Sequence, residues 1–234
     1  MSDGPGPGTI QTTALIVAAG SGLRLGAGGP KALVEVGGRP LFEWALDACR
    51  ESSRIGRIVI AVPPGHGREF AVDPERDEIL VDGGAARSQS VAAGLEAVET
   101  EFVLVHDAAR PLVTADLIDR TIFALEVEPD VDAVISAAPV TDTVKVIDHE
   151  GVVASTLDRD TLRSVQTPQV FRTEALRRAI ELGDVEQATD DAFLIESAGG
   201  RVGVFDGPPT NIKVTVPADL AMAEFLLGRD PENS

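Results

Sequence analysis

The chain has 234 residues, a net charge of −18 at pH 7 and a pI of about 4.4. This length suits one large domain, and the strongly negative charge opposes binding to nucleic acid or to an anionic membrane. A single cysteine, Cys49, excludes a disulfide framework, and no Cys or His cluster has metal-ligand spacing.

The two ends of the chain differ in composition from the rest. Residues 1–12 and 229–234 are rich in Gly, Pro and polar residues, so we predict disordered tails around one domain at 13–228. The first residues lack the features of a signal peptide, and no apolar run approaches the ~20 residues of a membrane span. We therefore predict a cytoplasmic protein with no membrane partner.

Apolar, β-branched runs predict strands, and helical patterns lie between most of them. The strands are predicted at residues 14–18, 57–62, 78–81, 102–106, 132–137, 164–171 and 201–205. The helices are predicted at residues 40–51, 88–98, 115–126, 173–181, 190–198 and 217–227. Strands such as FVLVHD are apolar on both faces, which is typical of a parallel sheet covered on both sides. The alternation predicts an α/β fold with a doubly wound, mostly parallel sheet.

One segment interrupts this alternation. From Asp142 to Arg159 the sequence alternates like a strand, turns at residues 149–151 and alternates again, which predicts a β-hairpin. A lone hairpin is marginally stable in water, so its valines must pack against another surface. That surface is either the parent domain or a second subunit, and the pattern leaves both open.

A glycine-rich loop follows the first predicted strand. Glycines at positions 20, 22, 26, 28 and 29 accompany two cations, Arg24 and Lys31. Residues 4–34 contain no acid, although a window of this length would hold about five at the chain's average (31 × 38/234). Bare amides and cations beyond the carboxyl end of a strand favour a phosphate-rich ligand. The alternative is a flexible loop whose charges are incidental.

Two familiar phosphate-binding motifs do not match this loop. A dinucleotide fingerprint needs G-x-G-x-x-G, and here the third glycine falls one place late, which disfavours a nicotinamide oxidoreductase. A P-loop needs G-x-x-x-x-G-K-[ST], and GGPKAL has neither the spacing nor the hydroxyl.

Three other stretches carry candidate site residues. Asp107 follows a buried strand at the same predicted sheet edge, where a carboxylate suits a divalent metal or a ribose hydroxyl, or else a turn or cap. Gly84 and Ser90 follow the third strand, where close approach to a flat base competes with helix capping. Lys213 is predicted in a short strand, as an edge charge or as an inward cation.

Taken together, the motifs AAGSGLRLGAGGPK, HDAARP, TLDR, QTPQVF and NIKVT resemble those of the 2-C-methyl-D-erythritol 4-phosphate cytidylyltransferases. The resemblance extends from Thr13 to about Leu227. It implies a Rossmann-like fold and the transfer of CMP from CTP to 2-C-methyl-D-erythritol 4-phosphate with release of pyrophosphate. It also implies Mg²⁺ and a homodimer in which the arm, about residues 139–160, embraces the other subunit.

The resemblance also assigns roles to individual residues. Arg24, Lys31 and Lys213 match catalytic cations around the triphosphate. Positions that match the CTP site are Ala18, Ala19, Gly20, Gly84, Ser90 and Asp107, and Asp107 also matches the metal ligand. Positions that match the polyol phosphate site are Arg110, Thr143, Arg159, Thr167 and Thr189. This sequence departs from the family at Ala85, where relatives can carry Asp, and the alanine side chain has no polar group for a contact there.

Two other functions remain open from the sequence. Ribitol 5-phosphate cytidylyltransferases share most of these motifs, although the second alanine of HDAARP favours the methylerythritol substrate. A non-catalytic nucleotide-sensing module is the alternative from a different class. Such a module needs no cations directed at a leaving group, so the set of Arg24, Lys31, Asp107 and Lys213 argues against it.

Overall fold

The computed structural model describes residues 12–26, 28–183, 188 and 190–228. Among these residues a seven-stranded sheet has the order β11-β7-β10-β6-β1-β4-β5. Strand β10 is antiparallel to both neighbours, and the other pairs are parallel. The strands are β1 (Thr12–Val17), β4 (Ile55–Val62), β5 (Glu78–Asp82), β6 (Phe102–Asp107), β7 (Ala133–Pro139), β10 (Arg163–Arg172) and β11 (Val202–Asp206). The predicted mostly parallel sheet is confirmed.

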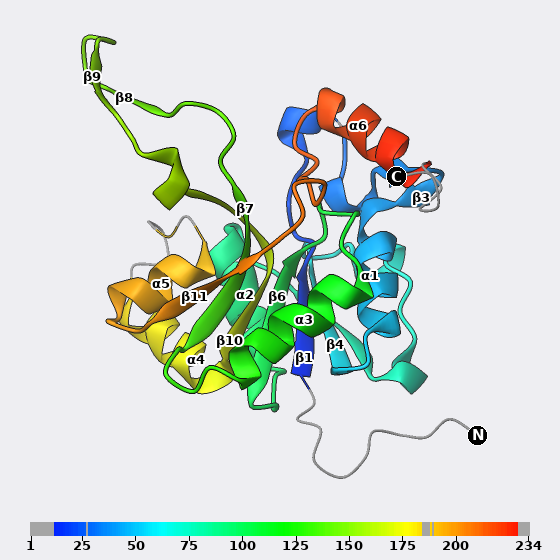
Figure 1. Ribbon diagram of the computed structural model, residues 1–234. Coiled ribbons are helices and arrows are strands. Elements are labelled where there is room, and N and C mark those ends of the chain that lie inside the picture. Colours follow the sequence, from blue (N-terminus) through cyan, green and yellow to red (C-terminus); the bar gives the residue numbers. More distant parts are fainter. Residues whose placement is uncertain (1–11, 27, 184–187, 189, 229–234) are drawn as a thin grey trace.

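Helices cover both faces of this sheet (Figure 1). They are α1 (Leu41–Glu51), α2 (Arg87–Leu95), α3 (Ala115–Glu126), α4 (Thr173–Leu182), α5 (Asp191–Ser197) and α6 (Pro217–Leu227). Helices α1 and α3 pack on one face, where Ile16 and Ile60 point, and α2, α4 and α5 pack on the other, where Leu15 and Val59 point. Because neighbouring residues of each strand face opposite layers, a strand buried on both faces must be apolar throughout.

Shorter elements surround the sheet. The two-residue strands β2 (Glu35–Val36) and β3 (Arg39–Pro40) form one small antiparallel pair. The 3₁₀ helices are η1 (Leu23–Leu25), η2 (Lys31–Leu33), η3 (Gly67–Glu69), η4 (Pro74–Arg76) and η5 (Arg159–Thr161). Helix α6 packs through Ala223 on Val36, Leu41 and Val214 in a third small core.

The predicted elements are confirmed with small shifts at their ends, and two predictions are wrong. Thr12, predicted in the tail, begins β1 and is fully buried, so the domain starts one residue earlier. The short strand predicted around Lys213 is absent, since residues 207–216 form neither helix nor strand. The remaining tail residues, 1–11 and 229–234, lie outside the described residues.

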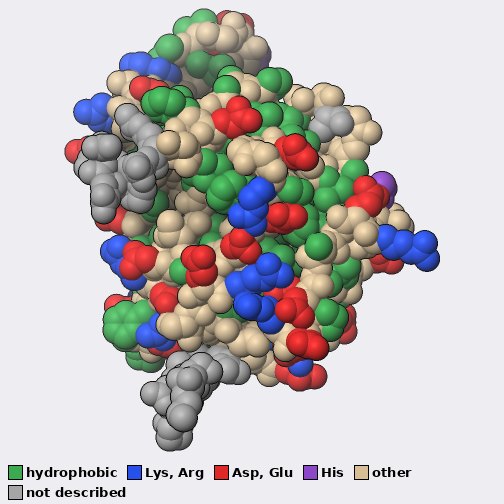
Figure 2. All heavy atoms as spheres, turned by 90° about the vertical axis from the view of Figure 1, so that its right-hand side faces the viewer, with side chains coloured by type: hydrophobic (Ala, Val, Ile, Leu, Met, Phe, Trp, Pro, Cys, Tyr) green, Lys and Arg blue, Asp and Glu red, His purple; other side chains and the backbone are tan. Residues whose placement is uncertain are grey.

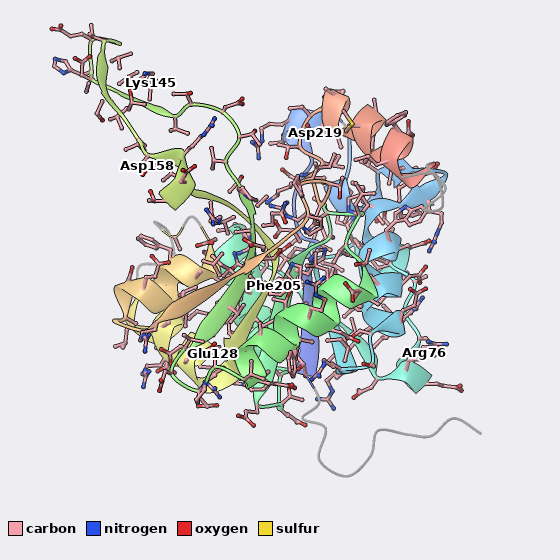
Figure 3. All side chains as sticks on the ribbon, in the orientation of Figure 1. Arg76, Glu128, Lys145, Asp158, Phe205 and Asp219 are labelled. Atoms are coloured by element: carbon pink, nitrogen blue, oxygen red, sulfur yellow. The ribbon has the colours of Figure 1, made fainter. Side chains whose placement is uncertain are left out.

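The predicted hairpin forms an arm that projects from the sheet, with β8 (Lys145–Ile147) paired to β9 (Val153–Thr156) (Figure 1). Lys145 lies far out along this arm and Asp158 nearer to its base (Figure 3). Ile147 and Val153 are 62% and 56% exposed. The arm's apolar side chains therefore do not pack on the parent domain, and that interpretation of the hairpin is wrong.

Charged side chains of both signs alternate on the face that carries α1 (Figure 2). Arg50 of α1 contacts both Asp47 and the buried Glu78. Because ion pairs of this kind place arginines among the acids, this face is not uniformly negative although the chain is acidic. None of the described helices is long and apolar enough to cross a membrane.

Candidate active site

A cavity of about 610 Å³ opens at the carboxyl ends of β1 and β6. Within the sheet, β4 and β5 lie on one side of β1, and the chain then returns to place β6 on the other side of β1. This change of direction leaves a crevice at the strand ends, which is where α/β sheets bind ligands. The lining comes from the end of β1, the glycine loop, the β5–α2 loop, the end of β6, and Lys213 and Thr215.

The glycine loop folds back on itself to reach this cavity. Gly22 has φ +68°, and a Cβ there would lie 3.1 Å from the Gly29 carbonyl oxygen, so glycine suits both the conformation and the close approach. The Lys31 amide donates to the Gly20 carbonyl at 2.9 Å and closes the loop. As a result, Arg24 and Lys31 both line the cavity, as predicted.

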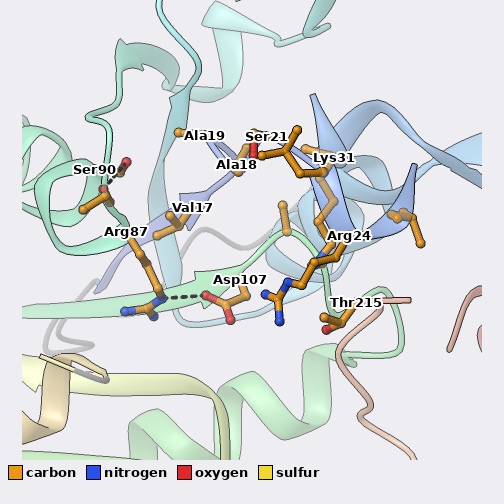
Figure 4. Close-up of a pocket in the computed structure, with 18 of the residues that line it drawn as sticks. Val17, Ala18, Ala19, Ser21, Arg24, Lys31, Arg87, Ser90, Asp107 and Thr215 are labelled. Atoms are coloured by element: carbon orange, nitrogen blue, oxygen red, sulfur yellow. Dashed lines mark hydrogen bonds and ion pairs between the residues drawn. The ribbon is translucent and has the colours of Figure 1, made fainter. Parts of the chain in front are cut away.

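Asp107 lies between two cations at the bottom of the site. Its Oδ1 accepts from Arg87 Nε at 2.9 Å, and its Oδ2 lies 2.6 Å from Lys213 Nζ. Figure 4 shows Arg87 and Ser90 on one side of Asp107, and Arg24 and Lys31 on the other. Burial alone would raise the pKa of Asp107, but the charges of Arg87 and Lys213 outweigh it and hold that pKa well below its usual range.

The pairing decides how Lys213 is oriented. The edge-strand interpretation is wrong: Lys213 is an inward cation that lines the cavity and is bound to Asp107. The Val214 amide donates to the Ala109 carbonyl at 2.8 Å, which ties this irregular segment to the end of β6. A backbone anchor of this type is invisible to side-chain periodicity.

Lys31 is crowded by other cations. Burial, the nearby Lys213 and, to a lesser degree, Arg24 lower the pKa of Lys31 to about 8, with Asp107 opposing the shift. Positive charges at close range repel one another, so in the absence of an anion they favour the neutral, deprotonated form of Lys31. A polyphosphate would relieve this repulsion.

This crowding predicts a pH dependence. Above about pH 8 Lys31 loses its charge in the free protein, so affinity for a polyphosphate falls as pH rises and is retained below that pH. We expect kcat/KM for the nucleotide to drop by up to about tenfold per pH unit above pH 8, and kcat at saturation to drop less, since bound anion restores the proton. Lys31→Arg stays charged, so its profile should be flat over the same range; parallel profiles would contradict this assignment.

The β5–α2 loop is shaped for close approach. Ser90, 1% exposed, accepts from the Gly84 amide at 3.1 Å and donates to the Ala86 carbonyl at 3.1 Å. A Cβ at Gly84 would overlap the Gln89 side chain, so this position requires glycine. Gly84 and Ser90 line the cavity together with Ala18, Ala19 and Gly20 of the β1 end.

Two of the predicted polyol-phosphate residues are buried instead of lining the cavity. Arg110 donates to the Asn211 carbonyl at 2.7 Å and to the Val165 carbonyl at 3.3 Å. Thr167 accepts from the Asp107 amide at 3.0 Å and contacts His106 Nδ1 at 3.0 Å. Burial lowers the pKa of His106 to about 4, so its ring is neutral and can accept from the Thr167 hydroxyl. In this chain Arg110 and Thr167 support the end of β6 that carries Asp107.

The other predicted polyol-phosphate residues are elsewhere. Thr143 and Arg159 lie on the arm, are exposed, and do not line the cavity; Arg159 donates to the Thr141 carbonyl at 2.9 Å. Thr189 lies outside the described residues.

Sequence reasoning missed Arg87 and Asp191. Arg87 lines the cavity and its Nη1 lies 2.6 Å from Asp191 Oδ2, while Asp191 is only 1% exposed. Burial raises the pKa of Asp191, and the Arg87 charge opposes that shift only in part. The available signal was an arginine three positions after the second glycine of GGAAR and an Asp pair opening a helix in TDDAFL.

Comparison with known proteins identifies this arrangement. The family profile of 2-C-methyl-D-erythritol 4-phosphate cytidylyltransferase matches residues 12–229. The chain belongs to this family. Its relatives include enzymes of that name from Rhodococcus jostii, 43% identical over 97% of this chain and 98% of the relative, and from Nocardia farcinica, 44% identical over 98% of each.

Solved structures of cytidylyltransferases have the same fold. The 2-C-methyl-D-erythritol 4-phosphate cytidylyltransferase of Thermus thermophilus superposes with a TM-score of 0.73 at 36% identity, covering 91% of this chain and 97% of that one. The 4-diphosphocytidyl-2C-methyl-D-erythritol synthase of Anaerococcus prevotii gives 0.80 at 33% identity, covering 94% and 99%. The predicted family and fold class are confirmed.

Proposed function

We propose that this cytidylyltransferase moves CMP from CTP to 2-C-methyl-D-erythritol 4-phosphate, forming 4-diphosphocytidyl-2-C-methyl-D-erythritol and pyrophosphate. The observation that carries the proposal is the convergence of Arg24, Lys31 and Lys213 around Asp107 in one cavity of an otherwise acidic protein. We infer the two substrates from the family to which the chain belongs.

The chemistry needs charge stabilisation more than proton transfer. A phosphate monoester has its second pKa near ~6, so the attacking phosphate is mostly a dianion at pH 7 and needs no general base. The barrier is repulsion between this dianion and the triphosphate, followed by charge that develops on the leaving pyrophosphate. Arg24, Lys31 and Lys213 provide fixed positive charge for both. Direct attack without an enzyme intermediate inverts the α-phosphorus.

The base and ribose fit the other half of the cavity. We assign the cytidine to the surface formed by Ala18, Ala19, Gly20, Gly84 and Ser90. Small side chains and bare backbone there leave room for a flat ring and offer amide and carbonyl groups to its edge. Ser90 acts by holding the loop shape through Gly84 and Ala86.

Mg²⁺ fits this site as an ion that arrives with the nucleotide. Asp107 is the acidic residue among the described residues that line the cavity, and Mg²⁺ is commonly held by one or two carboxylates together with substrate phosphates. Across the described chain no group of three or more His, Cys, Asp or Glu is placed to hold an ion by protein ligands. We assign Asp107 as the protein ligand; when bound, the ion neutralises phosphate charge.

We further propose that the chain is a homodimer through the Asp142–Arg159 arm. Exposed apolar residues, Ile147 and Val153 among them, give the arm a surface to bury against a partner. Ile147→Asp is expected to shift the protein to a monomer in sedimentation velocity experiments, since it places a charge in that surface. The matched change Arg120→Asp on α3 should leave the assembly unchanged, and a monomeric wild type would contradict the assignment.

The arm also carries the proposed polyol-phosphate ligands, Thr143 and Arg159. Arg159→Ala is expected to raise KM for the polyol phosphate by about tenfold or more while KM for CTP stays nearly constant, because it removes a cation from the phosphate of one substrate only. Arg120→Ala, which removes an exposed arginine from α3, is the control. If KM for CTP rises more, Arg159 does not bind the polyol phosphate.

The substrate itself is tested by measuring pyrophosphate release from CTP with each polyol phosphate in turn. We expect turnover with 2-C-methyl-D-erythritol 4-phosphate and little with ribitol 5-phosphate; the reverse preference would make the chain a ribitol enzyme, and CTP binding without turnover would make it a sensor. Its charge of −18 argues against a nucleic acid or membrane partner, and we place it in the cytoplasm.

A further inference from the structure

Four charged side chains of alternating sign form a continuous series of contacts that reaches the cavity. Arg87, Asp107 and Lys213 line the cavity, and Asp191 is buried beside Arg87. Asp191 contacts Arg87 at 2.6 Å, Arg87 contacts Asp107 Oδ1 at 2.9 Å, and Asp107 Oδ2 contacts Lys213 at 2.6 Å. The two negative charges of the carboxylates equal the two positive charges of Arg87 and Lys213, so the group has no net charge. Buried charges are tolerated when paired and hydrogen-bonded in this way.

The two oxygens of Asp107 are held differently. Arg87 is in the first turn of α2, and its planar guanidinium is forked between Asp107 and Asp191, the latter in the first turn of α5. Lys213 comes from an irregular segment, and its side chain is 39% exposed. A forked guanidinium has a fixed direction, whereas an ammonium on a flexible stem can change partners. Oδ1 is therefore anchored and Oδ2 is exchangeable.

We propose that Arg87 is a positioning residue for cytidylyl transfer, locked by Asp191 so that it holds Oδ1 of Asp107 and leaves Oδ2 available to the metal-bound triphosphate. Lys213 then leaves Oδ2 for a phosphate oxygen while Arg87 stays in place. This inference rests on the proposed function. Its rival is a purely structural role, in which Arg87 only ties α2 to α5.

A double variant separates these roles. Arg87→Met alone leaves two buried carboxylates short of a cation, and misfolding would then mask any effect on the reaction. Arg87→Met combined with Asp191→Asn removes one charge of each sign and keeps Asp107 paired with Lys213. Its thermal unfolding midpoint should exceed that of the Arg87→Met single variant.

A second ion-pair bridge in the same molecule supplies the matched control. Arg50 contacts Asp47 at 3.1 Å and the buried Glu78 at 2.7 Å, and none of the three lines the cavity. Arg50→Met with Glu78→Gln removes the same charges from a comparable bridge. It reports what loss of such a bridge does to stability and activity by itself.

The decisive readout is the gain in CTP affinity that Mg²⁺ produces, measured by calorimetry with and without the ion. In the Arg87→Met/Asp191→Asn variant, metal-free CTP affinity should stay within about threefold of wild type, because Arg24 and Lys31 remain. The gain from Mg²⁺ should be largely lost, and kcat should fall by about 10–10², the range for losing support of a metal ligand. The control variant should keep both.

Other outcomes decide against the inference. A folded double variant that keeps the Mg²⁺ gain and wild-type kcat makes Arg87 purely structural. If that variant does not fold, Asp191→Ala alone is measured, since it removes the contact that locks Arg87 and leaves Arg87 beside Asp107; an undiminished Mg²⁺ gain there also overturns the inference. A wild type that releases no pyrophosphate from CTP overturns the proposed function instead.

Discussion

Replacing Lys31 with alanine is expected to lower kcat by on the order of 10²–10³, the range for losing one donor that stabilises a transition state. Lys31 lines the cavity, and its charge interacts electrostatically with those of Asp107, Lys213 and Arg24. Because burial and neighbouring cations already lower the pKa of Lys31 to about 8, its charge is poorly solvated in the free protein and gains most when phosphate charge develops beside it.

The measurement is single-turnover kinetics of pyrophosphate release, which separates the chemical step from product release. KM for CTP should rise less than kcat falls, since Arg24 and Lys213 still hold the ground state. Arg178→Ala, which removes an exposed cation from α4, is the control for net charge and should leave kcat unchanged. A wild-type turnover number for Lys31→Ala would remove Lys31 from the catalytic set.

The fold was predictable because its signals are local. Strands buried on both faces, such as β6, carry unbroken apolar runs, and helices such as α3 begin and end where their patterns predict. The order of strands around β1 then places the glycine loop and Asp107 at one edge. Arg24 and Lys31 were found because the acid-free window is also a local property.

The rest of the site depends on long-range contacts. Arg87 and Asp191 meet across 104 positions of sequence, so no short motif links them. Lys213 lies in an irregular segment, where side-chain alternation gives no direction. Thr167 lies in the QTPQVF motif, and the sequence gives no sign that its hydroxyl bonds the Asp107 amide and His106. Only the three-dimensional structure shows which polar groups have hydrogen-bond partners within the protein.

Placing an acid in the glycine loop is expected to weaken CTP binding strongly. Ser21 is exposed, lines the cavity and belongs to the acid-free window, so Ser21→Asp adds a negative charge beside the triphosphate without disturbing the core. At an effective dielectric constant near 20, two unit charges about 5 Å apart repel by about 3 kcal/mol, which corresponds to a loss of affinity on the order of 10². Calorimetric titration with CTP measures this directly.

The variant that isolates the effect of charge is Ser21→Asn, because the asparagine side chain has nearly the same shape as aspartate but is uncharged. If the cleared acids matter electrostatically, Ser21→Asn binds CTP close to wild type, and the gap between the two variants narrows as salt is raised, because exposed charges are screened over about 8–10 Å at 0.1–0.15 M. Equal affinities for Asp and Asn at low salt would mean that the loop lacks acids for another reason. In that case Arg24 and Lys31 would not form a local positive potential within the acidic chain.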